Sequence, residues 1–267
     1  PNIGRYGRDF SAETGVRAEE TDAYDLQGAS VSASLSQPFN EQFTLSAGTT
    51  LDATRSTDYE LRAQGEDDYV EQVTLSFPLG ATYNTVKAPL DPQAGNRVSL
   101  GVEPGISFGD GEASYTRITS SASTYRKISD RLVAAVRAEA GTFLGDEGVP
   151  VDRKFFAGGG GSVRGFEYQS LSPTDSDGNI IGGDAMFAAS LELRWRKSER
   201  WGYVAFVDSG YAADSIDEAF GEMRTSFGLG VRFYPGFGPV RFDIATPLDR
   251  RDGEDPVQIY VSIGQSF

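Results

Sequence analysis

Residues 182–196 read GGDAMFAASLELRWR, and the alternation of side chains in this stretch decides the fold class. Apolar residues take every second position: Ala185, Phe187, Ala189, Leu191, Leu193 and Trp195. The positions between them include Glu192, Arg194 and Arg196. Successive side chains of a β-strand point to opposite sides of the sheet, so a period of two residues indicates a strand with one apolar face.

The same period recurs on both sides of this stretch. We predict an all-β, antiparallel protein of about twelve strands, with no convincing helix, that forms a single domain over residues 1–267. The predicted strands span 10–19, 24–39, 42–53, 72–85, 98–108, 112–127, 131–143, 184–196, 201–210, 226–233, 240–245 and 258–267. A long insertion, residues 144–183, separates the seventh strand from the eighth.

Strand length and loop pattern favour a transmembrane β-barrel over a soluble β-sandwich, which the alternation alone also allows. Strands of about ten residues suit a tilted crossing of a bilayer, and short turns contrast here with long acidic loops such as residues 55–68. Large aromatic residues cluster at strand ends, as in the aromatic girdles of such barrels. These residues are Trp195, Trp201, Tyr203, Phe233 and Tyr234.

An even number of strands allows the first strand to pair antiparallel with the last. An unpaired strand edge would be costly in lipid, because its backbone groups would have no hydrogen-bond partner. We therefore expect the sheet to close or nearly close. The alternative is that these strands are a piece of a larger barrel.

Composition excludes several classes of function. The chain has 267 residues with no histidine and no cysteine, so it lacks the imidazole that Ser-His hydrolases require. Its net charge of −15 opposes binding to nucleic acid. No cofactor or metal is predicted. Asp175, Asp177 and Asn179 alternate like the first ligands of a calcium loop, but Ile180 and Met186 occupy positions that need Gly and Glu, which favours an ordinary Asp-Gly-Asn turn.

The insertion contains the motif FFAGGGGSVRG, residues 155–165. Its glycine run comprises Gly158, Gly159, Gly160 and Gly161. Glycine accepts φ > 0, so this backbone can fold tightly into a confined space, and Arg164 follows at the next bend. From spacing alone, a flexible surface loop with one solvated arginine is also consistent.

With its flanks, this motif (FFAGGGGSVRGFEYQSLSP, 155–173) resembles the inserted loop of the BamA/TamA outer-membrane assembly superfamily, also called the surface-antigen family, and is most similar to TamA-like members. The segments 182–196, 201–212, 226–249 and 257–267 are similar, in order, to the last five strands of that superfamily. Its members have sixteen strands preceded by periplasmic POTRA modules. The predicted strands correspond to their last twelve, without the first four and without POTRA modules.

The resemblance implies that the loop folds back into the barrel lumen. Its functional motif maps onto Val163, Arg164, Gly165 and Phe166. In the superfamily, the motif arginine meets acidic residues on the inner wall, and the matching positions here are Glu192 and Asp208. This pairing either holds the loop in place or takes part in its motion during transport, and it implies no catalysis.

The resemblance also gives the last strand a role as the signal by which the envelope machinery recognises an unfolded barrel. The residues concerned are Tyr260, Val261, Ile263, Gly264 and Phe267. Recognition would occur by addition of this strand to an open sheet edge. A strand that only closes the barrel is the structural alternative.

These features predict a non-enzymatic barrel of the bacterial outer membrane that assembles, inserts or translocates proteins. The alternatives are a passive channel for small solutes, or the barrel anchor of a larger protein such as a two-partner secretion transporter or a patatin-type fusion. Expected partners are outer-membrane lipids and unfolded client barrels or autotransporters. A periplasmic partner of the TamB type is expected only if POTRA domains lie upstream, and no nucleic acid is expected.

Overall fold

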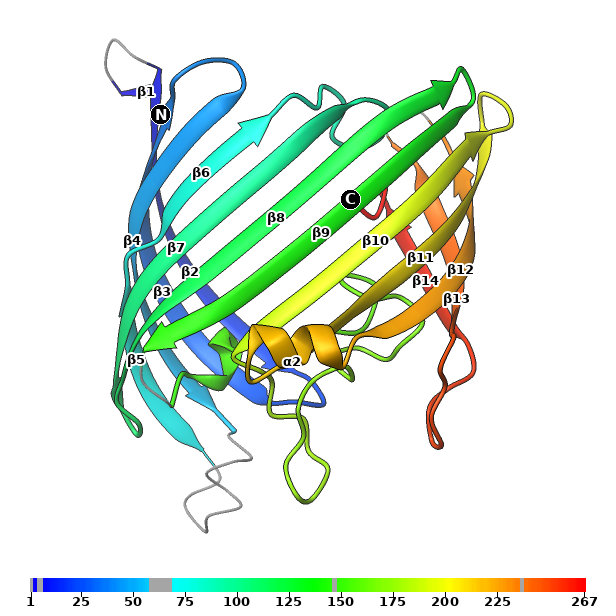
Figure 1. The fold of residues 1–267 in the computed structure, drawn as a ribbon. Helices are drawn as coiled ribbons and strands as arrows, with labels where there is room; N and C mark the ends of the chain where they lie inside the picture. The colour runs from blue at the N-terminus through cyan, green and yellow to red at the C-terminus, as the bar shows by residue number, and fades with distance from the viewer. Residues whose placement is uncertain (1, 4–6, 58–68, 146–147, 236–237) are drawn as a thin grey trace.

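The computed structural model describes residues 2–3, 7–57, 69–145, 148–235 and 238–267. Its strands form one antiparallel sheet that curls around a central lumen (Figure 1). The strands are β1 (Asn2–Ile3), β2 (Arg8–Glu20), β3 (Asp25–Pro38), β4 (Phe43–Ser56), β5 (Val70–Ser76), β6 (Leu79–Asn84), β7 (Gly95–Gly109), β8 (Ala113–Ser129), β9 (Leu132–Gly145), β10 (Ala185–Arg196), β11 (Trp201–Ala213), β12 (Arg224–Phe233), β13 (Val240–Pro247) and β14 (Gln258–Ile263).

The strands follow one another around the sheet in sequence order, and the prediction of an all-β antiparallel fold is confirmed. The count of about twelve needs correction, since the sheet has 14 strands among the described residues. One addition is the two-residue β1, and the other is a break in the fourth predicted strand. That strand is divided into β5 and β6 at Phe77 and Pro78, because proline has no N–H to continue the ladder.

The expectation of no helix was wrong in two short places, η1 (Val151–Arg153) and α2 (Ile216–Gly221). Helix α2 begins where the Ser215 hydroxyl accepts a hydrogen bond from the backbone N–H of Glu218 at 3.3 Å. Ser followed three residues later by Glu is a helix-start signal that the strand analysis missed. Among the described residues, no helix is long and apolar enough to cross a membrane.

The two faces of the sheet differ as the alternation predicts, and the structure settles which face lies outside. On β10, Leu191 and Leu193 are exposed on the outer surface, whereas Glu192 and Arg194 between them are buried in the lumen. A soluble sandwich would bury its large apolar side chains and expose its charges. The reverse arrangement rules out that alternative and gives the outer surface an apolar band, as a bilayer requires.

The connections at the two ends of the barrel are unequal (Figure 1). One end carries the described connections 148–184, 214–223 and 248–257, and we call it the long-loop end. The other, the short-turn end, carries tight turns such as residues 130–131 and 197–200. Here four of the five predicted girdle residues form pairs on the outer rim, with ring centroids 5.9 Å apart for Trp195 and Tyr203 and 5.0 Å apart for Trp201 and Phe233. The fifth, Tyr234, instead packs its ring 3.3 Å from the guanidinium of Arg196.

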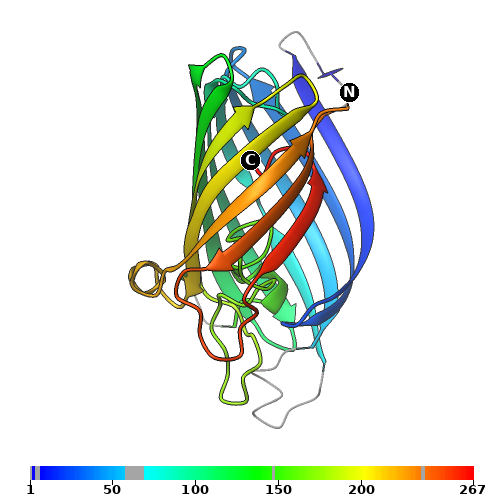
Figure 2. The same ribbon diagram turned by 90° about the vertical axis from the view of Figure 1, so that its right-hand side faces the viewer.

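The expected pairing of the first long strand with the last is absent from the described residues. The ladder of backbone hydrogen bonds runs from β1 to β14 and no strand pairing joins β14 to β2. Figure 2 views the side of the molecule on which these two strands lie.

The end of the chain also departs from the expectation. The last strand was predicted to run to Phe267 with that ring on its apolar face, but β14 ends at Ile263. Gly264 has φ of +94°, a conformation that other residues rarely adopt, and it turns the chain into the lumen. There the Phe267 ring lies 6.1 Å from that of Tyr125 on β8. Alternation within a strand cannot reveal such a turn beyond its end.

Candidate functional site

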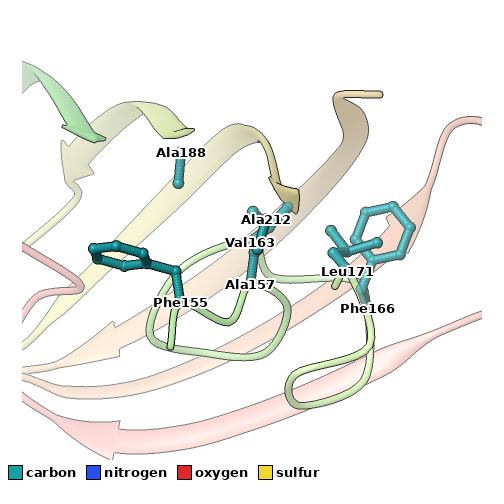
Figure 3. Packing of buried hydrophobic residues seen from close by; sticks show 7 residues of the cluster. All are labelled: Phe155, Ala157, Val163, Phe166, Leu171, Ala188 and Ala212. Atoms are coloured by element: carbon teal, nitrogen blue, oxygen red, sulfur yellow. The ribbon is translucent and has the colours of Figure 1, made fainter. Parts of the chain in front are cut away.

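We call the described part of the insertion between β9 and β10, residues 148–184, the lumen loop. It enters the curled sheet, as predicted, and part of it projects beyond the long-loop end of the barrel (Figure 1). Its neck is a pair of backbone hydrogen bonds of 2.8 Å between Phe155 and Gly183. Apolar residues of the loop then pack on small inward-facing residues of β10 and β11 (Figure 3). This buried cluster comprises Phe155, Ala157, Val163, Phe166, Leu171, Ala188 and Ala212.

Packing at this cluster places Arg164 against the inner wall. Val163 is fully buried beside Ala157 and Ala212 in Figure 3, so the next side chain points toward the charged positions of β11. Arg164 Nε lies 2.7 Å from Asp208 Oδ2 and Nη2 lies 3.0 Å from Oδ1. The backbone N–H of Arg164 also donates to Asp208, at 3.1 Å. The pair is therefore bidentate, the strongest geometry for arginine and carboxylate.

Two further carboxylates complete the site. Arg164 Nη1 lies 2.8 Å from Glu192 Oε1 on β10 and 3.1 Å from Asp243 Oδ2 on β13. The guanidinium carbon lies 3.4 Å from the centroid of the Phe206 ring, which the cation covers. The predicted pairing of Arg164 with Glu192 and Asp208 thus corresponds to direct contacts. Alternation did not single out Asp243 or Phe206 as partners.

The charges extend beyond Arg164 into a buried network. Asp243 also binds Arg232 on β12, and Glu192 Oε2 accepts a hydrogen bond of 2.7 Å from Arg194 Nε. All of these groups are nearly inaccessible to solvent. Burial alone would lower the pKa of Arg164, but its hydrogen bond to Asp208 and the charges of Glu192, Asp208 and Asp243 raise the pKa above its usual value. Arg164 is therefore a permanent cation.

The other motif residues have distinct contacts. The backbone N–H of Gly165 donates to the Tyr260 hydroxyl on β14 at 2.9 Å, and that hydroxyl donates to the carbonyl of Phe166 at 3.0 Å. Gly165 has φ of +96°, and a Cβ there would lie 2.7 Å from Ser226 Cβ, so only glycine fits. The Phe166 ring lies 5.0 Å from the guanidinium of Arg224.

The four glycines of the run differ in whether the fold of the loop requires a glycine at their position. Gly158 and Gly159 have positive φ, and Gly160 approaches the Tyr260 ring so closely that a Cβ would lie 3.0 Å from it. A Cβ on Gly161 would meet no atom within 4 Å. The tight fold predicted for the run therefore depends on its first three members.

The predicted residues of the last strand divide into two groups. Val261 and Ile263 are exposed on the outer face of β14, whereas Tyr260 points inward to the motif. Gly264 and Phe267 lie beyond the strand, and Arg194 Nη2 donates to the Phe267 carbonyl at 3.1 Å. The five predicted residues therefore do not share one face of a strand. Two face outward, one faces the lumen and two lie beyond the end of the strand.

The Asp-Gly-Asn turn is present at the tip of the lumen loop. Asp175 Oδ1 accepts hydrogen bonds from the backbone N–H groups of Asp177 at 2.9 Å and Asn179 at 2.8 Å. The Asn179 side chain donates to Oδ2 at 2.8 Å. The carboxylate of Asp175 thus organises its own turn, which agrees with the interpretation preferred from the sequence.

Comparison with known proteins agrees with this geometry. The sequence model of the Omp85 superfamily domain matches residues 1–267. The chain belongs to the Omp85 superfamily. A curated relative within it is the outer membrane protein assembly factor BamA of Nitratidesulfovibrio vulgaris, 36% identical over 152 residues, a match that covers 54% of this chain and 19% of the relative.

Solved structures of Omp85 proteins share the fold. BamA from Haemophilus ducreyi lacking POTRA domains 1–3 has a TM-score of 0.78 and 19% identity, over 97% of this chain and 59% of that one. CdiB from Acinetobacter baumannii has a TM-score of 0.59 and 16% identity, over 88% and 41% of the two chains. The chain thus spans less than two thirds of each of these proteins. Its predicted superfamily and its location in the bacterial outer membrane are confirmed.

Proposed function

We propose that the chain, as one barrel domain over residues 1–267, takes part in assembly, insertion or translocation of proteins at the outer membrane without chemical catalysis. One observation carries the proposal most directly. Arg164 of the lumen loop is bound by carboxylates from three different strands, Glu192, Asp208 and Asp243. Such a contact holds a loop in a lumen, and its carboxylates are paired with buried arginines rather than free to accept a proton.

The proposed partners follow from the outer surface and from the relatives. The apolar band on the outer face suits lipid, and the BamA relative is named as an assembly factor for outer membrane proteins. We therefore propose unfolded barrel or autotransporter chains as clients. A periplasmic partner of the TamB type stays a prediction that depends on POTRA domains.

The test uses the purified chain in lipid vesicles and a small outer-membrane barrel protein added from urea. Folding of the added protein is followed by its shift in mobility on unboiled gels. We expect faster insertion than into empty vesicles. An insertion rate equal to that of empty vesicles would contradict the assembly role in this form of the chain.

The variant Arg164→Ala, in the same vesicles, tests whether Arg164 holds the lumen loop in place. Loss of the three contacts should release the loop, lower the melting temperature and raise its sensitivity to protease. An unchanged melting point together with unchanged protease sensitivity would contradict the proposal that Arg164 holds the loop in the lumen.

The alternative function, a passive channel for small solutes, has its own test. Steady ion conductance of the unaltered chain in planar bilayers would favour that function over the assembly role.

A further inference from the structure

Helix α2 lies outside the barrel, on the outer face of the sheet. Figure 2 shows it clear of the wall at the long-loop end, in the connection between β11 and β12. The helix contacts β10 and β11, and its residue Ala219 is completely buried. One side of α2 is therefore packed on the wall, while the other side faces away from the protein.

Phe220 of α2 covers the barrel wall and leaves half of its own surface uncovered. Its ring centroid lies 4.3 Å from that of Phe187 on β10, and 51% of Phe220 is exposed. Phe187 belongs to the outer face of the sheet, because Leu191 and Leu193 alternate with it on the same strand and are exposed there. The exposed part of Phe220 is thus continuous with the apolar band that faces lipid.

The helix is amphipathic. Three apolar residues recur at the spacing i, i+3 and i+4, which gathers them on one side of the helix. They are Ile216, Ala219 and Phe220. The acidic residues Asp217, Glu218 and Glu222 are exposed and fall on the other side. A helix with this division lies in the plane of a bilayer surface, with its apolar side at the acyl chains and its charges among the headgroups.

The height of the apolar band places α2 at the edge of the bilayer. Trp195 marks the aromatic girdle at the short-turn end, and Phe187 lies eight residues earlier on the same strand. At about 3.3 Å per residue and a strand tilt of about 35–45°, these two residues are about 19–22 Å apart across the membrane. The apolar band of such barrels is about 25 Å tall and therefore extends past Phe187. Phe220, which is stacked on Phe187, then lies at the level of lipid rather than of water.

We propose that α2 is an interfacial anchor. It inserts Phe220 among the acyl chains of the leaflet at the long-loop end and holds Asp217 and Glu218 at the level of the headgroups. Lipid, and not a second protein chain, covers the exposed part of Phe220. The anchor sets the depth of the long-loop end in the bilayer. The inference rests on the outer wall of the barrel alone and does not depend on the proposed function in protein assembly.

The test measures the depth of α2 in the bilayer. The chain has no cysteine, so single substitutions introduce unique sites for nitroxide labels. Phe220→Cys and Glu222→Cys probe the two sides of the helix. Leu191→Cys, on the exposed outer face of β10, is the lipid reference, and Asp177→Cys, at the exposed tip of the lumen loop, is the aqueous reference.

Each labelled chain is placed in phosphatidylcholine nanodiscs, and power saturation compares collisions with oxygen and with a water-soluble nickel chelate. Oxygen concentrates among acyl chains and the chelate stays in water. We expect the oxygen-to-nickel ratio at position 220 to match that of Leu191→Cys, and the ratio at position 222 to match that of Asp177→Cys. A ratio at position 220 equal to the aqueous reference would overturn the proposal. So would a label at position 220 that meets neither collider, because protein rather than lipid would then cover it.

A second measurement keeps an aromatic ring in place. Phe220→Trp in a chain with Trp195→Phe and Trp201→Phe carries one tryptophan, whose fluorescence is quenched by phosphatidylcholine brominated on its acyl chains. Glu222→Trp in the same background is the matched control and should be quenched far less. Gel mobility of the unboiled protein shows that each variant is folded before it is measured. Equal quenching of the two tryptophans would contradict insertion of Phe220.

Discussion

Arg164 and Asp208 are joined by three hydrogen bonds, two from the guanidinium at 2.7 and 3.0 Å and one from the backbone N–H at 3.1 Å. Asp208 thus fixes both the side chain and the backbone of the motif. Glu192 and Asp243 hold only the guanidinium. Among the three carboxylates, Asp208 is the one whose loss affects the path of the loop itself.

Asp208→Ala should destabilise the folded barrel by about 3–5 kcal/mol, the typical effect of removing one partner from a buried ion pair. The measurement is urea unfolding in detergent micelles, followed by tryptophan fluorescence. Asp130→Ala is the control, because Asp130 pairs with Lys127 on the exposed surface, and it should leave the unfolding midpoint unchanged. Equal midpoints for the two variants would contradict the central position of Asp208.

Gly228 makes room for the Phe206 ring that underlies Arg164. A Cβ at Gly228 would lie 2.1 Å from Phe206 Cζ and 2.7 Å from the carbonyl oxygen of Ile244. Gly228→Ala should therefore displace the ring and destabilise the barrel by about 1–3 kcal/mol, as overpacking does. Gly161→Ala is the control, since its Cβ meets nothing within 4 Å. Matching unfolding midpoints for both alanine variants would show that the ring position is unimportant.

The alternation of residues predicted the strands well because each strand of this barrel has lipid on one side and the lumen on the other. The period is therefore imposed along most of the span, and β10 and β11, which flank the site, follow it except near the lumen loop, where Ala185 and Ala213 are also buried. The predicted strands were wrong where a local sequence feature interrupts the alternation. Pro78 interrupts its strand, and Ser215 starts a helix within a loop.

The site was only partly predictable for a related reason. Alternation places Glu192, Asp208 and Asp243 alike on the polar face, so it cannot tell which of them meets Arg164. The resemblance to a known family indicated the first two. Asp243 contacts Arg164 from 79 residues along the chain, a proximity that arises only when β13 curls around the loop. Arg17 on β2 likewise donates a hydrogen bond to Asp152, 135 residues along the chain, and this contact was unpredictable on the same ground.

Acid should loosen the tip of the lumen loop. Hydrogen bonds from Asn179 and from nearby backbone N–H groups hold the pKa of Asp175 below its usual value of 3.8. A carboxylate with a lowered pKa stabilises the folded turn fully above the usual value, and the stabilisation is lost as the pH falls through the lowered one. We expect amide exchange at Asp177 and Asn179, corrected for its intrinsic pH dependence, to accelerate below about pH 3.8.

Asp175→Asn should remove this pH dependence, because an amide does not titrate in that range. Asp177→Asn leaves the Asp175 carboxylate and its donors in place, so the acid transition should persist. Retention of the transition in Asp175→Asn would assign it to another group.

Phe267 allows the structural role of the chain end to be separated from a role in recognition. Its ring lies 6.1 Å from the Tyr125 ring and 5.1 Å from the Arg194 guanidinium, inside the lumen. If these contacts are what Phe267 contributes, Phe267→Ala should lower the free energy of unfolding of the purified barrel by about 1 kcal/mol, the scale of one aromatic and one cation–π contact. The yield of folded barrel in cells should then fall no further than that loss explains.

Tyr125→Ala provides the comparison, because it removes the same ring contact from the opposite side and leaves the chain end unaltered. A variant at Phe267 with unchanged stability in vitro but strongly reduced assembly in cells, while Tyr125→Ala assembles normally, would show that the residue acts as a recognition signal before the barrel folds.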